Sequence, residues 1–200
     1  LKGIDIREFG SGSTGATNAL RVLGKKPALL VLLVDILKGS AAVAAVGWAY
    51  RWDAVARWVP ATVDPGTIVP WLAVLAGLAA LLGHSQSAWL LLADDKPGLT
   101  KGGKSAATSL GVLLALSWPV GLATLGVFVG TLLVSRIVSL SSIAAATAVS
   151  GLMAAAQAPL AYCLFALTGG LYVIWRHRRN VERLFQGIEP RLGDKTASAK

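Results

Sequence analysis

The sequence predicts an all-α protein: a polytopic membrane helix bundle of about six spans, forming a single domain over residues 1–200. Two observations on composition point to it, because 54% of the residues are hydrophobic and only 14% are charged, whereas soluble proteins carry about 25% charged residues. The third is segmentation, since long apolar runs alternate with short polar stretches. Most of these runs approach the ~20 residues that an α-helix needs to cross a bilayer.

The predicted spans follow one another with short connections. The first begins at Pro27, a residue suited to a helix start, and Pro119 is expected to form a tight turn between the third and fourth. Residues 107–118 are short for a full crossing. The six spans are predicted at residues 27–50, 67–82, 107–118, 120–134, 144–156 and 160–175.

The basic residues lie mostly on one side of this bundle. If the first polar segment faces inside, the inside loops and tail are residues 1–26, 83–106, 135–142 and 176–200, and they hold sixteen of the nineteen Lys and Arg residues. The outside segments hold only Arg51 and Arg57, and Lys38 lies within a span. This asymmetry follows the positive-inside rule and makes the Lys- and Arg-rich segments cytoplasmic. The net charge of +9 therefore reflects topology, and we predict no nucleic-acid partner.

Several short motifs are misleading in this context. Residues 10–15 fit G-x-G-x-x-G and residues 98–105 fit the P-loop pattern, but both motifs require a preceding β-strand that a helix bundle lacks. His84 has Trp89, not Asp, at the spacing of the HxxxxD acyltransferases. A single cysteine, Cys163, allows no internal disulfide, and two histidines without an acidic cluster predict no metal site.

Three of the inside segments combine Gly or small hydroxyl residues with cations, an arrangement that suits phosphate oxygens. From the residues alone, two interpretations stay open: a site for phosphate groups, or ordinary cytoplasmic loops whose charge serves topology. The first segment contributes Ser11, Gly12, Ser13, Thr14, Asn18 and Arg21; the second His84, Lys101, Gly102, Gly103, Lys104, Ser105 and Thr108; the third Arg176, His177, Arg178, Asn180 and Arg183.

Two opposite charges lie inside the first span. Asp35 and Lys38 are three residues apart, so they can pair on one helix face, and each alone would cost ~2.5–3.5 kcal/mol at a helix centre. We expect a structural ion pair that faces the bundle; support of the active-site loops is the alternative.

The motifs occur in an order that resembles a known family. GSGSTGATNALR covers residues 10–21, GH residues 83–84, KGGKSAAT residues 101–108, and RHRRNVERLFQGIE residues 176–189, with LVDILKG at 33–39 and RIVSLSSI at 136–143. Together they resemble the bacterial acyl-phosphate:glycerol-3-phosphate acyltransferase family (PlsY type). The resemblance implies transfer of an acyl group from acyl phosphate to the 1-hydroxyl of glycerol 3-phosphate. The products are lysophosphatidate and phosphate, in phospholipid biosynthesis.

The resemblance also implies roles for single residues. The catalytic set is Ser11, Arg21, Lys104, His177 and Asn180; the substrate- or phosphate-binding set is Gly10, Gly12, Asn18, His84, Lys101, Gly102, Gly103 and Ser139; the structural set is Asp35, Lys38 and Glu189. The general base stays open between His84, His177 and a phosphate oxygen of the substrate. We expect a monomer without cofactor or metal in the bacterial inner membrane, with the active site on the cytoplasmic face and membrane lipids around it.

The sequence departs from the family pattern at a few places. The chain opens directly in the polar segment LKGIDIR, so we expect the first of the family's seven spans to be missing. The stretch between His84 and Lys101 is longer than usual, and Ser13 and Ser105 replace Asn and Gly. The competing prediction is a small transporter or channel subunit. Transporters place polar, unwound backbone near the bilayer midplane, often within internal repeats, and neither feature is evident here.

Overall fold

The computed structural model describes residues 3–52, 57, 60, 62–86 and 102–193. All regular secondary structure in these ranges is helical, which confirms the predicted all-α bundle. A short 3-10 helix, η1, spans Ile6–Glu8. The α-helices are α1 (Ala16–Val22), α2 (Lys25–Tyr50), α4 (Pro65–Ser85), α6 (Ala106–Leu116), α7 (Trp118–Ser135), α8 (Val138–Ala155), α9 (Leu160–Arg176) and α10 (Arg178–Phe185).

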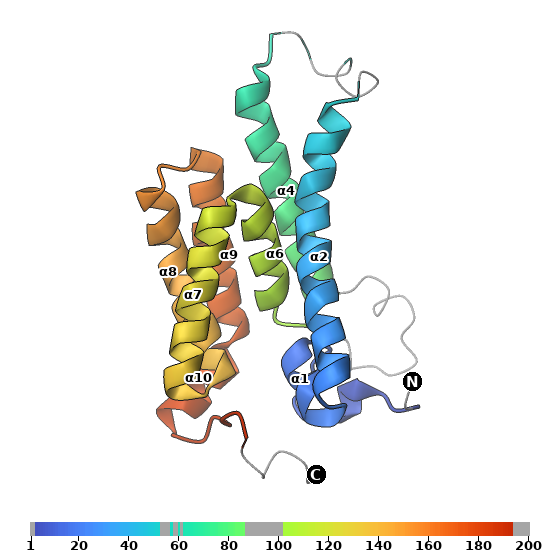
Figure 1. Ribbon diagram of the computed structural model, residues 1–200, viewed down its shortest axis with the longest axis vertical. Coiled ribbons are helices and arrows are strands. Elements are labelled where there is room, and N and C mark those ends of the chain that lie inside the picture. Colours follow the sequence, from blue (N-terminus) through green and yellow to red (C-terminus); the bar gives the residue numbers. More distant parts are fainter. Residues whose placement is uncertain (1–2, 53–56, 58–59, 61, 87–101, 194–200) are drawn as a thin grey trace.

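Each of the six predicted apolar runs contains a helix. Four of the described helices, α2, α4, α7 and α8, are long and apolar enough to cross a membrane, and α6 and α9 are shorter apolar helices of 11 and 17 residues. At 1.5 Å per residue, α6 is about 16 Å long, roughly half of a ~30 Å hydrocarbon core. The segment before α6 therefore ends inside the bundle, well away from its lower rim (Figure 1).

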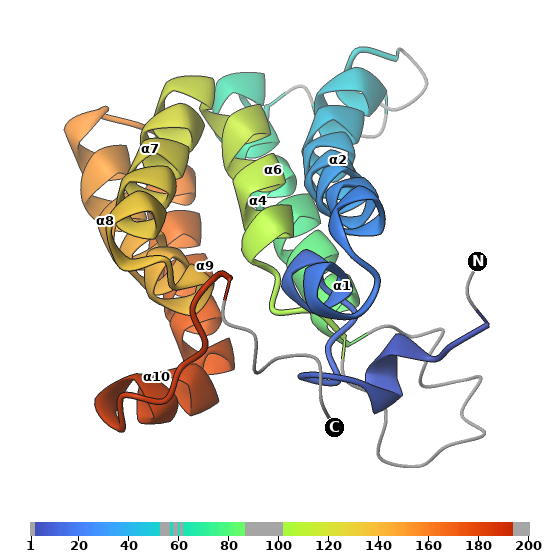
Figure 2. The ribbon, with the colours of Figure 1, turned by 60° about the horizontal axis from the view of Figure 1, so that its bottom comes forward.

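The helices form two groups that α6 joins. α2 packs along α4 and α6, while α7 packs on α8 and α8 on α9; α6 contacts members of both groups. Figure 1 shows α2 and α4 side by side and α7, α8 and α9 together. The short helices α1 and α10 lie at the same end of the bundle (Figure 2). This end carries the three motif segments.

The structure differs from the predicted boundaries in the polar segments. We predicted loops and a tail at residues 1–26, 135–142 and 176–200, but α1 and α10 form within the first and the last, and α8 already begins at Val138. Because α10 is a single short polar helix, it gives no apolar run to detect. The turn before α7 is made by Ser117, and Pro119 lies in the first helical turn, where its missing N–H is not needed.

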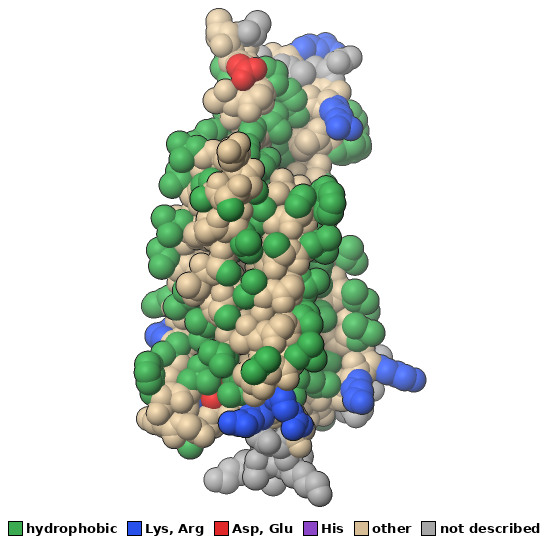
Figure 3. Space-filling model, turned by 60° about the vertical axis from the view of Figure 1, so that its left-hand side comes forward, with side chains coloured by type: hydrophobic (Ala, Val, Ile, Leu, Met, Phe, Trp, Pro, Cys, Tyr) green, Lys and Arg blue, Asp and Glu red, His purple; other side chains and the backbone are tan. Residues whose placement is uncertain are grey.

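The outer surface of the bundle is apolar. Leu133 and Val134 are 77% and 90% exposed, and on the face in Figure 3 hydrophobic side chains cover the middle of the molecule while Lys and Arg lie near its ends. Such a distribution fits a lipid-facing belt between two polar interfaces. The buried core lies between the helices, around Val112, Met153 and Phe165.

Candidate active site

A cavity of about 420 Å³ opens at the end of the bundle that carries the motifs. Its walls change character along its length. One part is lined by polar residues: Ser11, Ser13, Asn18, Arg21, His84, Lys104, Ser139, Ser142, His177, Asn180, Arg183 and Glu189. The other part is lined mainly by apolar residues of α2 and α6–α9, with Asp35 and Thr124 among them: Leu32, Ile36, Leu113, Leu125, Phe128, Ala145, Ala146, Val149, Phe165, Gly169 and Val173.

The first motif is folded around Asn18. The Asn18 side chain is 1% exposed, its Oδ1 accepts from Ser11 N at 2.9 Å, and its Nδ2 donates to three backbone carbonyls at 2.9–3.2 Å. Gly10 and Gly12 have φ of +61° and +67°, which glycine adopts without strain. These contacts place Ser11 and Arg21 at the cavity. Asn18, Gly10 and Gly12 therefore determine the conformation of the loop. The phosphate-binding role of these three residues stays a prediction.

The second motif is bound to the end of α4. Gly103 N donates to the His84 carbonyl at 3.2 Å, and the Ser105 hydroxyl donates to Leu81 O at 3.0 Å and lies 2.5 Å from the Ser85 hydroxyl. Ser105 has φ +62°, in the left-handed region that favours glycine, and its hydroxyl contacts hold it there. Lys104 thereby lines the cavity, and the predicted phosphate-binding residue Lys101 lies outside the described residues.

Glu189 joins the third motif to α8. Its Oε1 accepts from Ser139 Oγ at 2.7 Å and Asn180 Nδ2 at 2.6 Å, and its Oε2 accepts from Arg183 Nε at 2.6 Å. Burial alone would raise the pKa of Glu189, but the hydrogen bonds from these three residues outweigh it and hold the pKa below its usual value. The carboxylate therefore stays charged and orients Asn180, whose Oδ1 accepts from Lys104 Nζ at 2.6 Å.

His177 is a buried, neutral imidazole at the cavity wall. It is 3% exposed, and its Nδ1–H donates to Val173 O at 2.8 Å, because a carbonyl oxygen can only accept. Burial lowers its pKa to about 4, and the nearby charges of Lys104 and Arg176 act in the same direction. At neutral pH, Nε2 therefore keeps its lone pair and can accept a hydrogen bond from a substrate hydroxyl.

The cavity is electropositive at its polar end. Burial lowers the pKa of Lys104 to about 8, the neighbouring charges of Arg183, Arg21 and Arg176 act in the same direction, and Glu189 opposes them. Arg21 lines the cavity and has no hydrogen-bonded or ion-paired partner in the described part of the chain. Arg21 is therefore a cation without a protein partner among the described residues, and burial disfavours the charged form of the neighbouring Lys104. Both side chains would be stabilised by an anionic ligand.

The structure brings together most of the predicted site residues. The cavity is lined by Ser11, Asn18, Arg21, Asp35, His84, Lys104, Ser139, His177, Asn180 and Glu189, but not by Gly10, Gly12, Lys38, Gly102 or Gly103. Ser142 also lines it and was not among the predicted site residues. Its spacing of three from Ser139 was the available signal, because residues three apart share a helix face, but residues 135–142 were predicted as a loop, whereas α8 begins at Val138. Within the described ranges, no group of three His, Cys, Asp or Glu side chains is placed to hold a metal.

The sequence profile described as glycerol-3-phosphate acyltransferase matches residues 1–187 of the chain. The chain belongs to the glycerol-3-phosphate acyltransferase family. A glycerol-3-phosphate acyltransferase from Trichormus variabilis is 56% identical over 195 residues, which cover 98% of this chain and 83% of the relative. The enzyme class predicted from the motifs is thereby confirmed over the transporter alternative.

Solved structures agree with this family assignment. The chain is similar to the crystal structure of PlsY (YgiH), an integral membrane glycerol 3-phosphate acyltransferase, in its glycerol 3-phosphate form. The TM-score is 0.77 at 36% identity, covering 96% of this chain and 84% of that one. For the lysphosphatidic acid form, the TM-score is 0.73 at 35% identity, covering 92% and 81%. With its apolar helices, this glycerol-3-phosphate acyltransferase is a multi-pass membrane protein.

Proposed function

We propose that this enzyme takes its acyl group from an acyl phosphate and transfers it to the 1-hydroxyl of glycerol 3-phosphate, releasing phosphate and lysophosphatidate. The observation that carries the proposal is a single cavity that joins a cationic end to an apolar shaft. An acyl phosphate has this polarity, with an anionic head on a hydrocarbon chain. We further propose that the site faces the cytoplasm of a bacterial cell across its inner membrane, because the Lys- and Arg-rich segments gather at this end.

The cationic end suits a reaction between two anions. Glycerol 3-phosphate and the acyl phosphate repel one another, and the charges of Arg21 and Lys104 at the cavity wall offset that repulsion. Charge stabilisation in a site with little water is usually the largest contribution to catalysis. Holding both substrates at reacting distance supplies much of the remainder.

The chemical step needs no covalent enzyme intermediate, because the mixed anhydride is already activated. The 1-hydroxyl oxygen attacks the acyl carbonyl carbon, the bond from that carbon to the phosphate oxygen breaks, and the electron pair leaves on phosphate. His177, with a pKa lowered to about 4, is a poorer base than the departing phosphate, whose second pKa is about 6 in phosphate esters. We therefore assign the hydroxyl proton to phosphate and the orientation of the hydroxyl to His177.

The donor is tested with purified enzyme in lipid vesicles, supplied with palmitoyl phosphate and glycerol 3-phosphate. We expect release of one phosphate for each lysophosphatidate formed, with competitive inhibition by inorganic phosphate at the anion site. Palmitoyl-CoA replaces palmitoyl phosphate in the control and should give no product. Product from palmitoyl-CoA, together with no phosphate release from palmitoyl phosphate, would overturn the proposed donor and leave the family assignment standing.

The apolar shaft predicts an effect of chain length. Gly169 lines the cavity, and a Cβ there would lie 3.7 Å from the Phe165 ring, so the backbone tolerates Gly169→Leu while the larger side chain enters the shaft. We expect kcat/KM for palmitoyl phosphate to fall by about tenfold, or ~1.4 kcal/mol, which lies within the ~1–3 kcal/mol that overpacking costs. Butanoyl phosphate, whose chain is too short to reach this depth, should be little affected.

Gly151→Leu is the matched control for the shaft variant. Gly151 is exposed on α8 and nothing lies within 4 Å of a Cβ there, so both donors should react as with the unchanged enzyme. Equal losses for palmitoyl and butanoyl phosphate in Gly169→Leu would show that the acyl chain lies elsewhere.

A further inference from the structure

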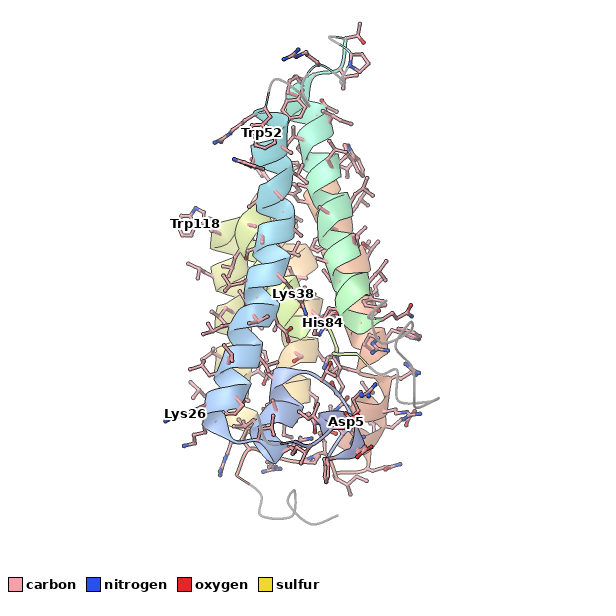
Figure 4. The ribbon with its side chains drawn as sticks, turned by 90° about the vertical axis from the view of Figure 1, so that its right-hand side faces the viewer. Asp5, Lys26, Lys38, Trp52, His84 and Trp118 are labelled. Atoms are coloured by element: carbon pink, nitrogen blue, oxygen red, sulfur yellow. The ribbon has the colours of Figure 1, made fainter. Side chains whose placement is uncertain are left out.

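Two charges inside α2 contact a residue of another helix in addition to each other. Asp35 and Lys38 are the only charged residues between Lys26 and Arg51, and Lys38 Nζ lies 2.6 Å from Asp35 Oδ1. The His84 ring reaches them from the end of α4: its Nδ1 lies 3.4 Å from Asp35 Oδ1 and also contacts Lys38 Nζ. Figure 4 shows Lys38 and His84 pointing toward one another, far from both Lys26 and Trp52.

The chemistry of these contacts defines how the His84 ring is held. An ammonium group has donors only, so Lys38 donates to Nδ1, while Asp35 holds Lys38 in place. The Asp35 and His84 side chains are only 9% and 7% exposed, and the Lys38 side chain is 36% exposed. A partly buried charge pair of this kind stabilises little by itself but defines one geometry when its hydrogen bonds are satisfied. The cluster therefore sets the orientation of the imidazole at the end of α4.

The opposite edge of the same ring supports the Gly-rich segment. A Cβ on Gly103 would overlap the His84 imidazole, and a Cβ on Gly102 would lie 2.6 Å from the Ser85 carbonyl oxygen. Gly103 N also donates to the His84 carbonyl at 3.2 Å. The two glycines are thus packed directly on His84 and Ser85, immediately before Lys104.

Close packing of α2 against α6 brings the two charges of α2 near the segment that precedes α6. A Cβ on Gly39 of α2 would overlap the carbonyl oxygen of Thr108, and a Cβ on Gly111 of α6 would overlap that of Ile36. Small residues allow such close backbone approach in membranes. The first turns of α6 therefore lie against α2 near Asp35 and Lys38, and the His84 ring lies between this ion pair and the Gly102–Gly103 turn.

We propose that Asp35, Lys38 and His84 are positioning residues for acyl transfer, which hold the Gly102–Gly103 turn in place and so set where Lys104 lies in the cavity. This proposal rests on the proposed function, because the proposed reaction supplies the phosphate that Lys104 binds. In this role, His84 acts through the backbone of the turn and does not need to touch the substrate.

The test is the pH dependence of kcat/KM for glycerol 3-phosphate in His84→Ala. Without the ring, the turn relaxes and the Lys104 ammonium becomes more exposed, so the alkaline decrease in activity should move upward from about pH 8 toward the ordinary lysine value of 10.5. The groups that face Lys104 and stay unchanged are Arg21, Arg176, His177, Arg183 and Glu189. Misplacement of Lys104 should also lower kcat/KM at pH 7 by roughly 10- to 100-fold.

Ser40→Ala is the matched control, because the Ser40 hydroxyl links α2 to α6 by donating to Gly111 O at 2.8 Å and does not touch the turn. It should lower the melting temperature without moving the alkaline decrease. Should His84→Ala not accumulate in the membrane, Asp35→Asn, which loosens Lys38, should move the decrease in the same direction. An unmoved decrease in either variant overturns the positioning role, and a raised KM alone would indicate direct contact of His84 with phosphate.

A double-mutant cycle of His84 and Lys104 tests the positioning role separately from the proposed function. In a Lys104→Ala background, His84→Ala should cause little further loss, since residues that act through one another are not additive. Additive losses would contradict the coupling. Full activity of Lys104→Ala itself would instead refute the part of Lys104 in the proposed function.

Discussion

Replacement of Lys104 by Ala should lower kcat/KM by about 100-fold or more, which corresponds to about 2.7 kcal/mol of transition-state stabilisation. Lys104 lines the cationic end of the cavity, and its Nζ already donates to Asn180 Oδ1 at 2.6 Å, so its remaining donors can reach a phosphate. Charge-assisted hydrogen bonds of this kind are about twice as strong as neutral ones. The loss is measured from steady-state rates with palmitoyl phosphate and glycerol 3-phosphate.

The same lysine predicts a pH effect of defined sign. Burial lowers the pKa of Lys104 to about 8, and only its protonated form binds phosphate, so kcat/KM should be full below that pH and decrease as pH rises through about 8. Lys104→Arg keeps its charge throughout this range and should lose the alkaline decrease. Arg51 lies at the opposite end of α2, so Arg51→Ala should leave rates unchanged. A loss equal to that of Lys104→Ala would show that the active site does not lie at the proposed end of the bundle.

Replacement of Arg21 by Ala should also lower kcat/KM by about 100-fold, with no loss of stability. Within the described residues, Arg21 has no protein partner, and its guanidinium belongs to the cavity wall. Its removal therefore leaves no buried group unpaired, in contrast to Lys104→Ala, which takes a donor from Asn180. When both are measured on the same preparation, kcat/KM should fall while the melting temperature stays unchanged.

Lys26→Ala is the control for Arg21. Lys26 is exposed in the first turn of α2, at the same end of the bundle, so it carries the same charge at the surface without entering the cavity. Its replacement should change kcat/KM by less than about twofold, because exposed charges are screened. A comparable loss in both variants would mean that general attraction of anionic substrates, and not a defined contact, explains the effect of Arg21.

The amino-acid sequence was sufficient to predict the class of fold and the end of the bundle at which we propose the chemistry. Apolar runs of span length predict membrane helices because each backbone group in lipid must be hydrogen-bonded within its own segment, and all six runs contain a helix. The concentration of Lys and Arg in the same segments as the Gly-rich motifs predicted that these motifs lie at one end of the bundle. Short polar helices such as α10 could not be predicted in this way, because a polar stretch of eight residues contains no apolar run of span length.

The contacts between side chains that are distant in the sequence could be read only from the three-dimensional structure. Lys104 and Asn180 are separated by 76 residues, and Lys38 and His84 by 46, so no local pattern pairs them. The binding role of Asn18 stays a prediction, and the structure adds that the hydrogen bonds of its amide close the first loop. The physical reason is packing: small residues such as Gly39 and Gly111 let α2 and α6 approach closely, and this approach brings a half-length helix, an intramembrane ion pair and the Gly-rich turn together.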